Sequence, residues 1–166
     1  FQSKPATAFS PVAVTLDELG DAWNKGRASL TVQSTWNGRK VGMCDAGTEM
    51  TFHFGQLIAH ICKTRNVRAG SIVGSGTISN RAIEKNGKKE WVNGYSCIAE
   101  KRAIETILDG KPSMAYMKFG DTIRIEAIAS LVHAEVVHGI VMIPNPEFKV
   151  IIRAVVFVGS DITLEG

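Results

Sequence analysis

The dipeptide Asn37-Gly38 is the feature of this sequence that most restricts its fold. Asn-Gly between two alternating segments is the strongest short-range signal for a two-residue β-turn, because both residues accept a positive φ. Residues 30–35 alternate apolar and polar side chains before the turn, and residues 40–43 follow as the return strand. A two-residue turn joins antiparallel neighbours, so the sequence predicts at least one antiparallel sheet.

Helices are expected in three places along the chain. A capping box of Thr15 and Glu18 predicts a helix over residues 16–25 that stops at Gly26. Apolar residues at helical spacing predict a second helix from Thr51 onward, and a third one that ends at Gly110. The apolar positions of these two helices are Phe54, Leu57, Ile58 and Ile61, and Cys97, Ile98, Ile104, Ile107 and Leu108.

Short strands and turns occupy the intervening segments. Residues 71–79 form an apolar strand interrupted by glycines, and residues 80–94 are a polar, basic surface loop. A turn at 119–121 precedes a strand over 122–128. Two β-branched runs, 136–143 and 150–158, predict a hairpin, which separates residues 129–166 as an atypical apolar tail from the domain formed by 1–128.

Composition excludes several classes of protein. The 166 residues are 45% apolar and 21% charged, which is typical of one globular domain. The net charge of +3 is too small to indicate nucleic-acid binding, and no apolar run is long enough for a membrane span. Three cysteines without C-x-x-C spacing argue against disulfides and a zinc site, and favour a reducing, cytoplasmic location. The chain opens with Phe1, so it is a processed chain or part of a longer one.

Four groups of residues are candidates for chemistry. The segment Gly74-Ser-Gly-Thr-Ile-Ser79 lets a ligand approach the backbone and offers N–H groups to a carboxylate; the alternative is a kinked strand. Glu100 is either a buried base or an ordinary acid in a helix first turn. His53, Gln56 and His60 share one face of the predicted helix. This face either binds a metal or substrate or is a solvated, hydrogen-bonded surface. On a strand, His133 and Glu135 point to the opposite face from His138, which argues against a shared metal.

Five motifs in order resemble the C-terminal domain of the fumarylacetoacetate hydrolase family, over residues 1–128. They are the loop around Lys4, Phe54-Gly-Gln-Leu-Ile-Ala-His60 with Val67-Arg-Ala-Gly70, Gly74-Ser-Gly-Thr-Ile-Ser79, Gly94-Tyr-Ser-Cys-Ile-Ala-Glu100, and Met117-Lys-Phe-Gly-Asp-Thr122. The resemblance implies an α+β, β-rich fold of mixed sheets, roll-like, with two to three short helices. It also implies a cytoplasmic homodimer.

The resemblance implies metal-dependent hydrolysis of a C–C bond in a diketo or 2-oxo acid, as in aromatic amino-acid catabolism. Decarboxylation or isomerisation within the same family is the alternative. Carried over by position, Lys4 would hold negative charge developing on the substrate, and Gly76 with Thr77 would bind its carboxylate. Glu100 would orient the catalytic histidine, and Gln56 would contact substrate.

The sequence departs from the family at the metal site. The family's ligands for Mg²⁺, Mn²⁺ or Ca²⁺ and its catalytic histidine precede the lysine loop at which this chain begins. No ligand set is therefore evident, although Asp45 and Glu49 are possible substitutes. We expect little or no turnover from this chain alone.

Two other functions are weighed against this one. A non-catalytic, self-associating fragment is suggested by the apolar tail, whose edge strands need partners. A nucleic-acid module rests only on the basic loop at 81–89, and no aromatic platform accompanies that loop.

Overall fold

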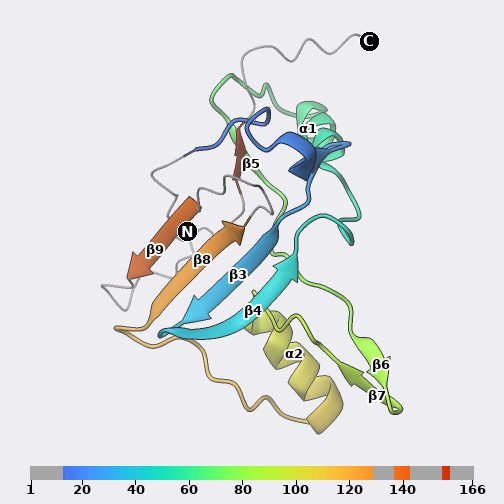
Figure 1. Cartoon of the computed structure of the whole chain (residues 1–166), viewed down its shortest axis with the longest axis vertical. Coiled ribbons are helices and arrows are strands. Elements are labelled where there is room, and N and C mark those ends of the chain that lie inside the picture. Colours follow the sequence, from blue (N-terminus) through green and yellow to red (C-terminus); the bar gives the residue numbers. More distant parts are fainter. Residues whose placement is uncertain (1–12, 129–136, 143–154, 158–166) are drawn as a thin grey trace.

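A four-stranded antiparallel sheet is the centre of the fold (Figure 1). The structure, a computed structural model, describes residues 13–128, 137–142 and 155–157. The strand order is β4-β3-β8-β9, with β3 at Thr31–Trp36, β4 at Arg39–Asp45, β8 at Thr122–Ile128 and β9 at Val137–Met142. The predicted α+β class is confirmed, with antiparallel pairing throughout the described strands. The roll-like closure stays a prediction.

The Asn37-Gly38 turn forms as predicted. Asn37 has a φ of 48° and Gly38 a φ of 76°, and the flanking pair is Trp36 with Arg39. The Asn37 side chain also joins the hairpin to the turn before β8, since it donates to Asp121 Oδ1 at 2.8 Å and accepts from the Thr122 amide at 2.8 Å. The Asn37 side chain therefore links the β3–β4 hairpin to the turn that precedes β8.

One face of this sheet is buried around β3 and β4. Val32, Ser34 and Cys44 are almost completely buried there, and the register places Val32 opposite Cys44. The segment after β7 (Lys88–Glu90) covers them, and the Ser34 hydroxyl donates to Ser96 Oγ at 3.0 Å. The sheet face is thus closed partly by polar contacts rather than by apolar packing alone.

The outer edge of β4 is covered by residues 93–95. The Met43 amide donates to the Asn93 carbonyl at 2.7 Å, and the Tyr95 amide donates to the Val41 carbonyl at 3.0 Å. Between these bonds Gly42 and Gly94 face each other in an isolated bridge. A covered edge cannot pair with another chain at that point.

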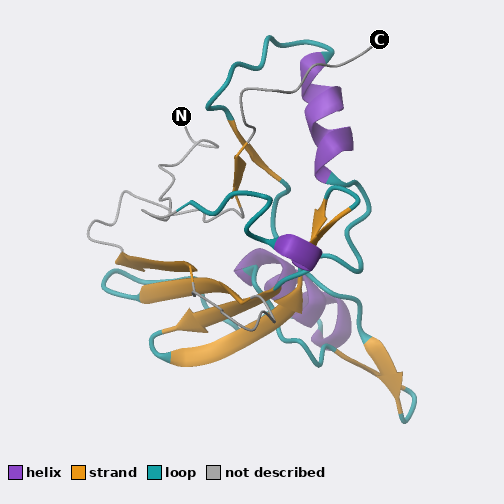
Figure 2. Ribbon diagram, turned by 45° about the horizontal axis from the view of Figure 1, so that its top comes forward, coloured by secondary structure: helices purple, strands orange, loops and turns teal. Residues whose placement is uncertain are grey.

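Two α-helices flank the sheet (Figures 1 and 2). The first, α1, spans Phe54–Cys62, and the second, α2, spans Ile98–Asp109. Gly110 ends α2 in the left-handed conformation at φ 79°, as the sequence predicted. In Figure 1, α2 lies below β4, whereas α1 lies above the upper ends of β3 and β4.

The predicted helix over residues 16–25 is wrong. The Thr15 amide does donate to Glu18 Oε2 at 3.1 Å, so half of the capping box exists. Gly20 then takes a φ of 50°, which no α-helix accommodates, and only a 3₁₀ turn, η1 at Gly20–Ala22, forms. The strands β1 (Trp23–Asn24) and β2 (Arg27–Ala28) follow and pair around a turn at Gly26.

Three further short strands lie outside the main sheet. β5 (Ile72–Gly74) begins the predicted glycine-interrupted segment. The basic loop contains a hairpin of β6 (Ile83–Lys85) and β7 (Lys88–Glu90), exposed along its whole length. It extends away from the sheet in Figure 1.

The described parts of the two apolar runs near the C-terminus, β9 and β10 (Val155–Phe157), do not form the predicted hairpin. β9 pairs with β8, and β10 pairs with β5. Each of these two strands therefore pairs with a strand from earlier in the chain. The division into domains at residue 128 stays a prediction.

Candidate functional site

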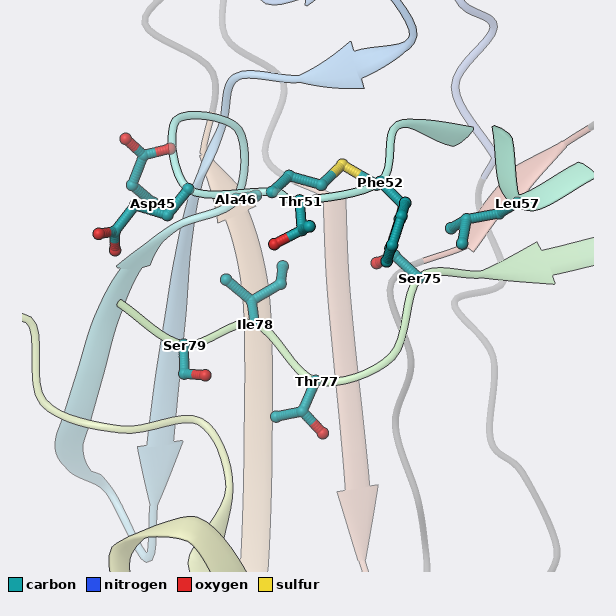
Figure 3. A pocket seen from close by; sticks show the side chains of 11 residues that line it. Asp45, Ala46, Thr51, Phe52, Leu57, Ser75, Thr77, Ile78 and Ser79 are labelled. Atoms are coloured by element: carbon teal, nitrogen blue, oxygen red, sulfur yellow. The ribbon is translucent and has the colours of Figure 1, made fainter. Parts of the chain in front are cut away.

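A pocket of about 280 Å³ lies between the end of β4, the start of α1 and the segment after β5 (Figure 3). Its walls combine two acids, four hydroxyl side chains and an apolar patch. The lining residues are Asp45, Ala46, Glu49, Met50, Thr51, Phe52, Leu57, Ser75, Thr77, Ile78 and Ser79. Three parts of the chain that are far apart in sequence thus meet at one site.

The segment 75–79 supplies most of the hydroxyl groups. Gly76 has a φ of 94°, a conformation that strongly favours glycine, and this turns the chain after β5. In Figure 3, Ile78 points toward Thr51, while Thr77 and Ser79 point to the other side of the segment. The Thr77 and Ser79 side chains therefore lie on the exposed side of the segment, whereas Ile78 faces the part of the pocket formed by Thr51.

The Asp45 carboxylate organises the turn after β4. Its Oδ1 accepts from the amides of Gly47 at 2.8 Å and Thr48 at 3.1 Å, and its Oδ2 accepts from the Thr48 hydroxyl. Burial raises the pKa of Asp45, but these hydrogen bonds outweigh burial and hold the pKa below its ordinary value. Asp45 is therefore ionised near neutral pH, and both of its oxygens are engaged.

Asn80 connects this turn to the segment that covers β4. Its Oδ1 accepts from the Asp45 amide at 2.8 Å and from Asn93 Nδ2 at 2.8 Å, and its Nδ2 donates to the Asp45 carbonyl at 3.0 Å. Glu49 makes a parallel contact, since its Oε2 accepts from the Arg81 amide at 2.8 Å. Both sides of the pocket are held together by these side chains.

A divalent metal in this pocket would need carboxylate oxygens that are not already engaged by hydrogen bonds or ion pairs. The Asp45 oxygens accept three hydrogen bonds, and Glu49 binds both the amide and the guanidinium of Arg81. Within the described residues no group of three or more His, Cys, Asp or Glu side chains could hold a metal. The described residues of the pocket therefore do not fit a metal.

The structure brings together only some of the predicted site residues. Thr77 lines the pocket, and Gly76 lies between two lining residues. Gln56 caps α1 instead, because its Oε1 accepts from the His53 amide at 3.1 Å, and His53 Nδ1 accepts from the Gln56 amide. His53 and Gln56, two of the three residues of the predicted polar stripe, therefore form the N-terminal cap of α1.

Glu100 and the remaining candidates lie elsewhere. Glu100 is exposed in the first turn of α2 and is not one of the pocket-lining residues. Its environment is that of an ordinary helix acid, the alternative given above. Lys4, His133 and Glu135 lie outside the described residues, and His138 falls within β9.

Sequence reasoning missed Asn80, Thr51 and Phe52. Asn80 directly follows the glycine-interrupted segment, and an Asn at a strand exit is a frequent side-chain partner of turns. The position of Asn80 in the sequence could therefore have indicated that its side chain binds a turn. Nothing in the sequence pairs Asn80 with Asp45 across 35 positions, so the contact could be found only from the fold.

A second pocket, about 590 Å³, lies near the opposite end of β4. It is lined by Trp36, Asn37, Arg39, Lys40, Val41, Tyr95, Lys101 and Met114. One of its cations is already paired, since Lys101 Nζ lies 3.4 Å from Glu105 Oε1.

Fold and site together define an α+β domain with a hydroxyl-lined pocket beside a glycine-interrupted strand. The family model described as fumarylacetoacetate (FAA) hydrolase, C-terminal, matches residues 2–142, so the chain belongs to this family. The match includes β9. It therefore extends beyond residue 128, at which the resemblance identified from the sequence motifs ends. No curated protein matches the chain. None of the described helices is long and apolar enough to cross a membrane.

Proposed function

We propose that this chain contributes the substrate-holding part of a hydrolase or decarboxylase site for a diketo or 2-oxo acid. Membership of the family supports a hydrolase- or decarboxylase-type function. The single observation that supports the substrate class is that segment 75–79 lines the pocket with three hydroxyl-bearing residues, Ser75, Thr77 and Ser79. Hydroxyl groups donate hydrogen bonds to carboxylate and oxo oxygens alike.

The geometry assigns separate tasks to the polar residues. Thr77 and Ser79 are available to substrate, because both residues line the pocket and are exposed. Asp45 and Glu49 are committed to the loops, as their contacts with Thr48 and Arg81 show. We assign these two acids a positioning role rather than a role in proton transfer.

Charge limits how tightly the pocket binds an anion. No Lys or Arg is among the lining residues, whereas Asp45 and Glu49 are. A carboxylate therefore meets donors without a compensating cation, and Coulomb repulsion opposes binding. We expect millimolar affinity, on the order of 1 mM or weaker, for a small keto acid. Because Asp45 and Glu49 are committed to the loops and the described residues do not fit a metal, we expect the chain alone to bind substrate without appreciable turnover.

The test uses ligand-observed NMR, which detects weak binding. Saturation-transfer spectra would be recorded with pyruvate and with 2,4-dioxopentanoate, first on the natural chain and then on Thr77→Val. The variant keeps the side-chain volume and removes the hydroxyl. Thr64→Val is the matched control, because Thr64 is exposed and is not a lining residue.

We expect the saturation-transfer signal to fall at least threefold in Thr77→Val and to be unchanged in Thr64→Val. An equal signal from both variants would refute the role of Thr77. Absence of a signal from the natural chain at 10 mM ligand, about tenfold above the expected dissociation constant, would refute the substrate class. Rapid release of product from 2,4-dioxopentanoate by the natural chain would contradict the expected lack of turnover.

A further inference from the structure

The second pocket, near the end of β4 opposite to segment 75–79, is lined by positively charged residues. Its described lining residues include Arg39, Lys40 and Lys101 but no Asp or Glu, whereas those of the first pocket include two acids and no cation. Its volume of about 590 Å³ lies within the range of roughly 300–1,000 Å³ that is usual for small-molecule sites. An anion is therefore favoured in the second pocket and opposed in the first.

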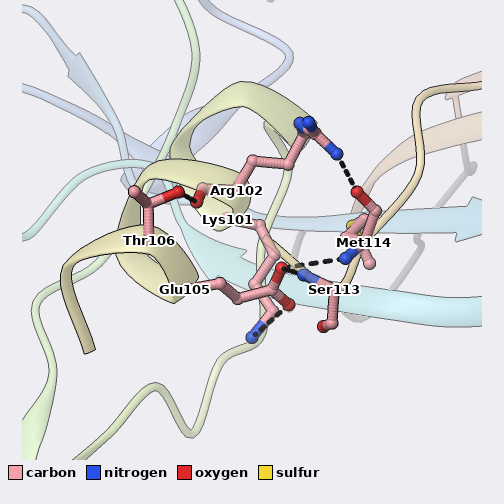
Figure 4. A network of polar contacts seen from close by, with 6 residues as sticks. All are labelled: Lys101, Arg102, Glu105, Thr106, Ser113 and Met114. Carbon is pink, nitrogen blue, oxygen red and sulfur yellow. Dashed lines mark hydrogen bonds and ion pairs between the residues drawn. The ribbon is translucent and has the colours of Figure 1, made fainter. Parts of the chain in front are cut away.

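Two carboxylates lie next to the lining residues, and both are already engaged. Glu105 Oε2 accepts hydrogen bonds from the backbone amides of residues 113 and 114, and its Oε1 lies 3.4 Å from Lys101 Nζ (Figure 4). Asp121 Oδ1 accepts from Asn37 Nδ2 at 2.8 Å, and its Oδ2 accepts from a backbone amide of the same turn at 2.7 Å. Glu105 thus offsets the charge of Lys101, and Asp121 is bound within the turn before β8.

Arg39 and Lys40 supply the net positive charge of the pocket, because Glu105 offsets that of Lys101. Both residues are exposed, and the contact of 3.4 Å from Lys40 Nζ to Met43 Sδ is with a neutral thioether, which leaves the charge of the lysine in place. Two positive charges match a phosphate monoester, whose charge near pH 7 is about −1.5 to −2. A guanidinium can also bind two phosphate oxygens at once.

Two aromatic residues, Trp36 and Tyr95, line the pocket beside these cations. Trp36 lies directly opposite Arg39 in the β3–β4 register, so their side chains share one face of the sheet. Burial raises the pKa of the Tyr95 hydroxyl, the positive charge of Arg39 opposes this shift, and the negative charge of Glu105 adds to it. The Tyr95 hydroxyl is therefore protonated near neutral pH and is within electrostatic reach of Arg39, where it can donate to an anion.

Hydrogen bonds within the protein hold each wall of this pocket in place. The Asn37 side chain joins the β3–β4 hairpin to the turn before β8, and the Tyr95 amide donates to the Val41 carbonyl at 3.0 Å. Glu105 fixes the chain at residues 113 and 114. The β3–β4 ladder also skips Val41, and a bulge of this kind bends and twists the strand locally. The pocket is thus formed in the absence of a ligand, which lowers the cost of binding.

We propose that this second pocket binds a phosphate monoester that carries a flat aromatic ring, the chemistry of a mononucleotide. Arg39 and Lys40 hold the phosphate, and the Tyr95 hydroxyl is a further donor to it. The ring packs against Trp36, since aromatic rings stack favourably on one another. This site is separate from the pocket at segment 75–79, so it does not depend on the function proposed above.

The first experiment compares three probes by isothermal titration calorimetry at low salt, because salt screens exposed charges. AMP carries phosphate and ring, ribose 5-phosphate lacks the ring, and adenosine lacks the phosphate. We expect a dissociation constant below about 1 mM for AMP and no measurable binding of adenosine. Loss of the ring should weaken binding about threefold or more. Absence of AMP binding would overturn the proposal, as would binding of AMP that is no tighter than that of adenosine or of ribose 5-phosphate.

The second experiment locates the site with matched arginine variants. Arg39→Gln should raise the dissociation constant for AMP about tenfold, because a charge-assisted hydrogen bond is lost. Arg68→Gln is the control, since Arg68 is also an exposed arginine but is not a lining residue. Its dissociation constant should equal that of the natural chain. Equal weakening in both variants would indicate general attraction to a basic chain and would refute the site, and so would undiminished binding in Arg39→Gln.

Discussion

Because Gly42 and Gly94 approach each other closely, substituting either one should lower the free energy of unfolding. The size of the loss can be worked out from the structure. A Cβ on Gly94 would lie 2.2 Å from the Val41 carbonyl oxygen, and Gly94 also has a φ of 68°. An L-residue in the left-handed region costs about 1–2 kcal/mol. Separating the two segments also breaks the bonds that Met43 and Tyr95 donate, each with a net worth of about 1 kcal/mol.

Gly94→Ala should therefore lower the free energy of unfolding by about 3–4 kcal/mol. Two other substitutions separate the contributions. Gly87 has a similar φ of 72° with nothing within 4 Å, so Gly87→Ala should cost only the backbone term of about 1–2 kcal/mol. Gly42 has no positive φ, but its Cβ would lie 2.3 Å from the Tyr95 carbonyl oxygen, so Gly42→Ala should cost about 2 kcal/mol from the lost bonds.

Urea unfolding followed by tryptophan fluorescence measures all three free energies. For a chain of this length the loss in Gly94→Ala corresponds to a melting temperature lower by roughly 6–16 °C. The decisive comparison is Gly94→Ala against Gly87→Ala. If the two variants lose the same stability, the bridge between β4 and residues 93–95 contributes nothing, and the reasoning from the close approach is refuted.

Two further predictions concern side chains that hold the loops. Asn80→Ala removes three hydrogen bonds to Asp45 and Asn93 and should destabilise the chain by about 2 kcal/mol in urea unfolding; a change below about 0.5 kcal/mol would contradict this. Hydrogen bonds from the Met114 and Ser113 amides, with the nearby Lys101, lower the pKa of Glu105 from 4.5 to about 2, although burial opposes the shift. Because the folded-state pKa is depressed, the stabilisation by ionised Glu105 is complete above the unfolded value and disappears as the pH falls from about 4.5 to 2. The stability difference between the natural chain and Glu105→Gln should therefore shrink over that range, and a difference independent of pH would contradict the shift.

Local signals predicted the elements whose ends are decided by local backbone conformation. Asn37-Gly38 specified a turn that requires two positive φ values, and Gly110 specified the end of α2. The same reasoning failed at residues 16–25, where the capping residues were present but Gly20 adopted a positive φ. A capping box indicates where a helix can begin. It does not determine whether the helix continues beyond its first turn.

The pocket was predictable in part, because the glycine-interrupted segment is visible in the sequence and its partners are not. Thr77 was identified from its neighbouring glycines and lines the pocket. Asp45 and Asn80 meet only because β4 ends beside the exit of segment 75–79. Such contacts depend on the sheet topology, which no local pattern encodes.

The orientation of α2 shows the same division between local and long-range information. Helical spacing identifies Ile104, Ile107 and Leu108 as one face, and an amphipathic pattern alone would turn that face toward the core. The structure instead leaves Ile107 and Leu108 exposed and Ile104 half-buried, while the buried Glu105 accepts hydrogen bonds from the amides of Ser113 and Met114. An ionised carboxylate accepting two amide hydrogen bonds is a stronger local constraint than the burial of a few apolar side chains on a small domain. Ile107 and Leu108 then stay in contact with solvent, and the hydrophobic stabilisation that their burial would supply is lost.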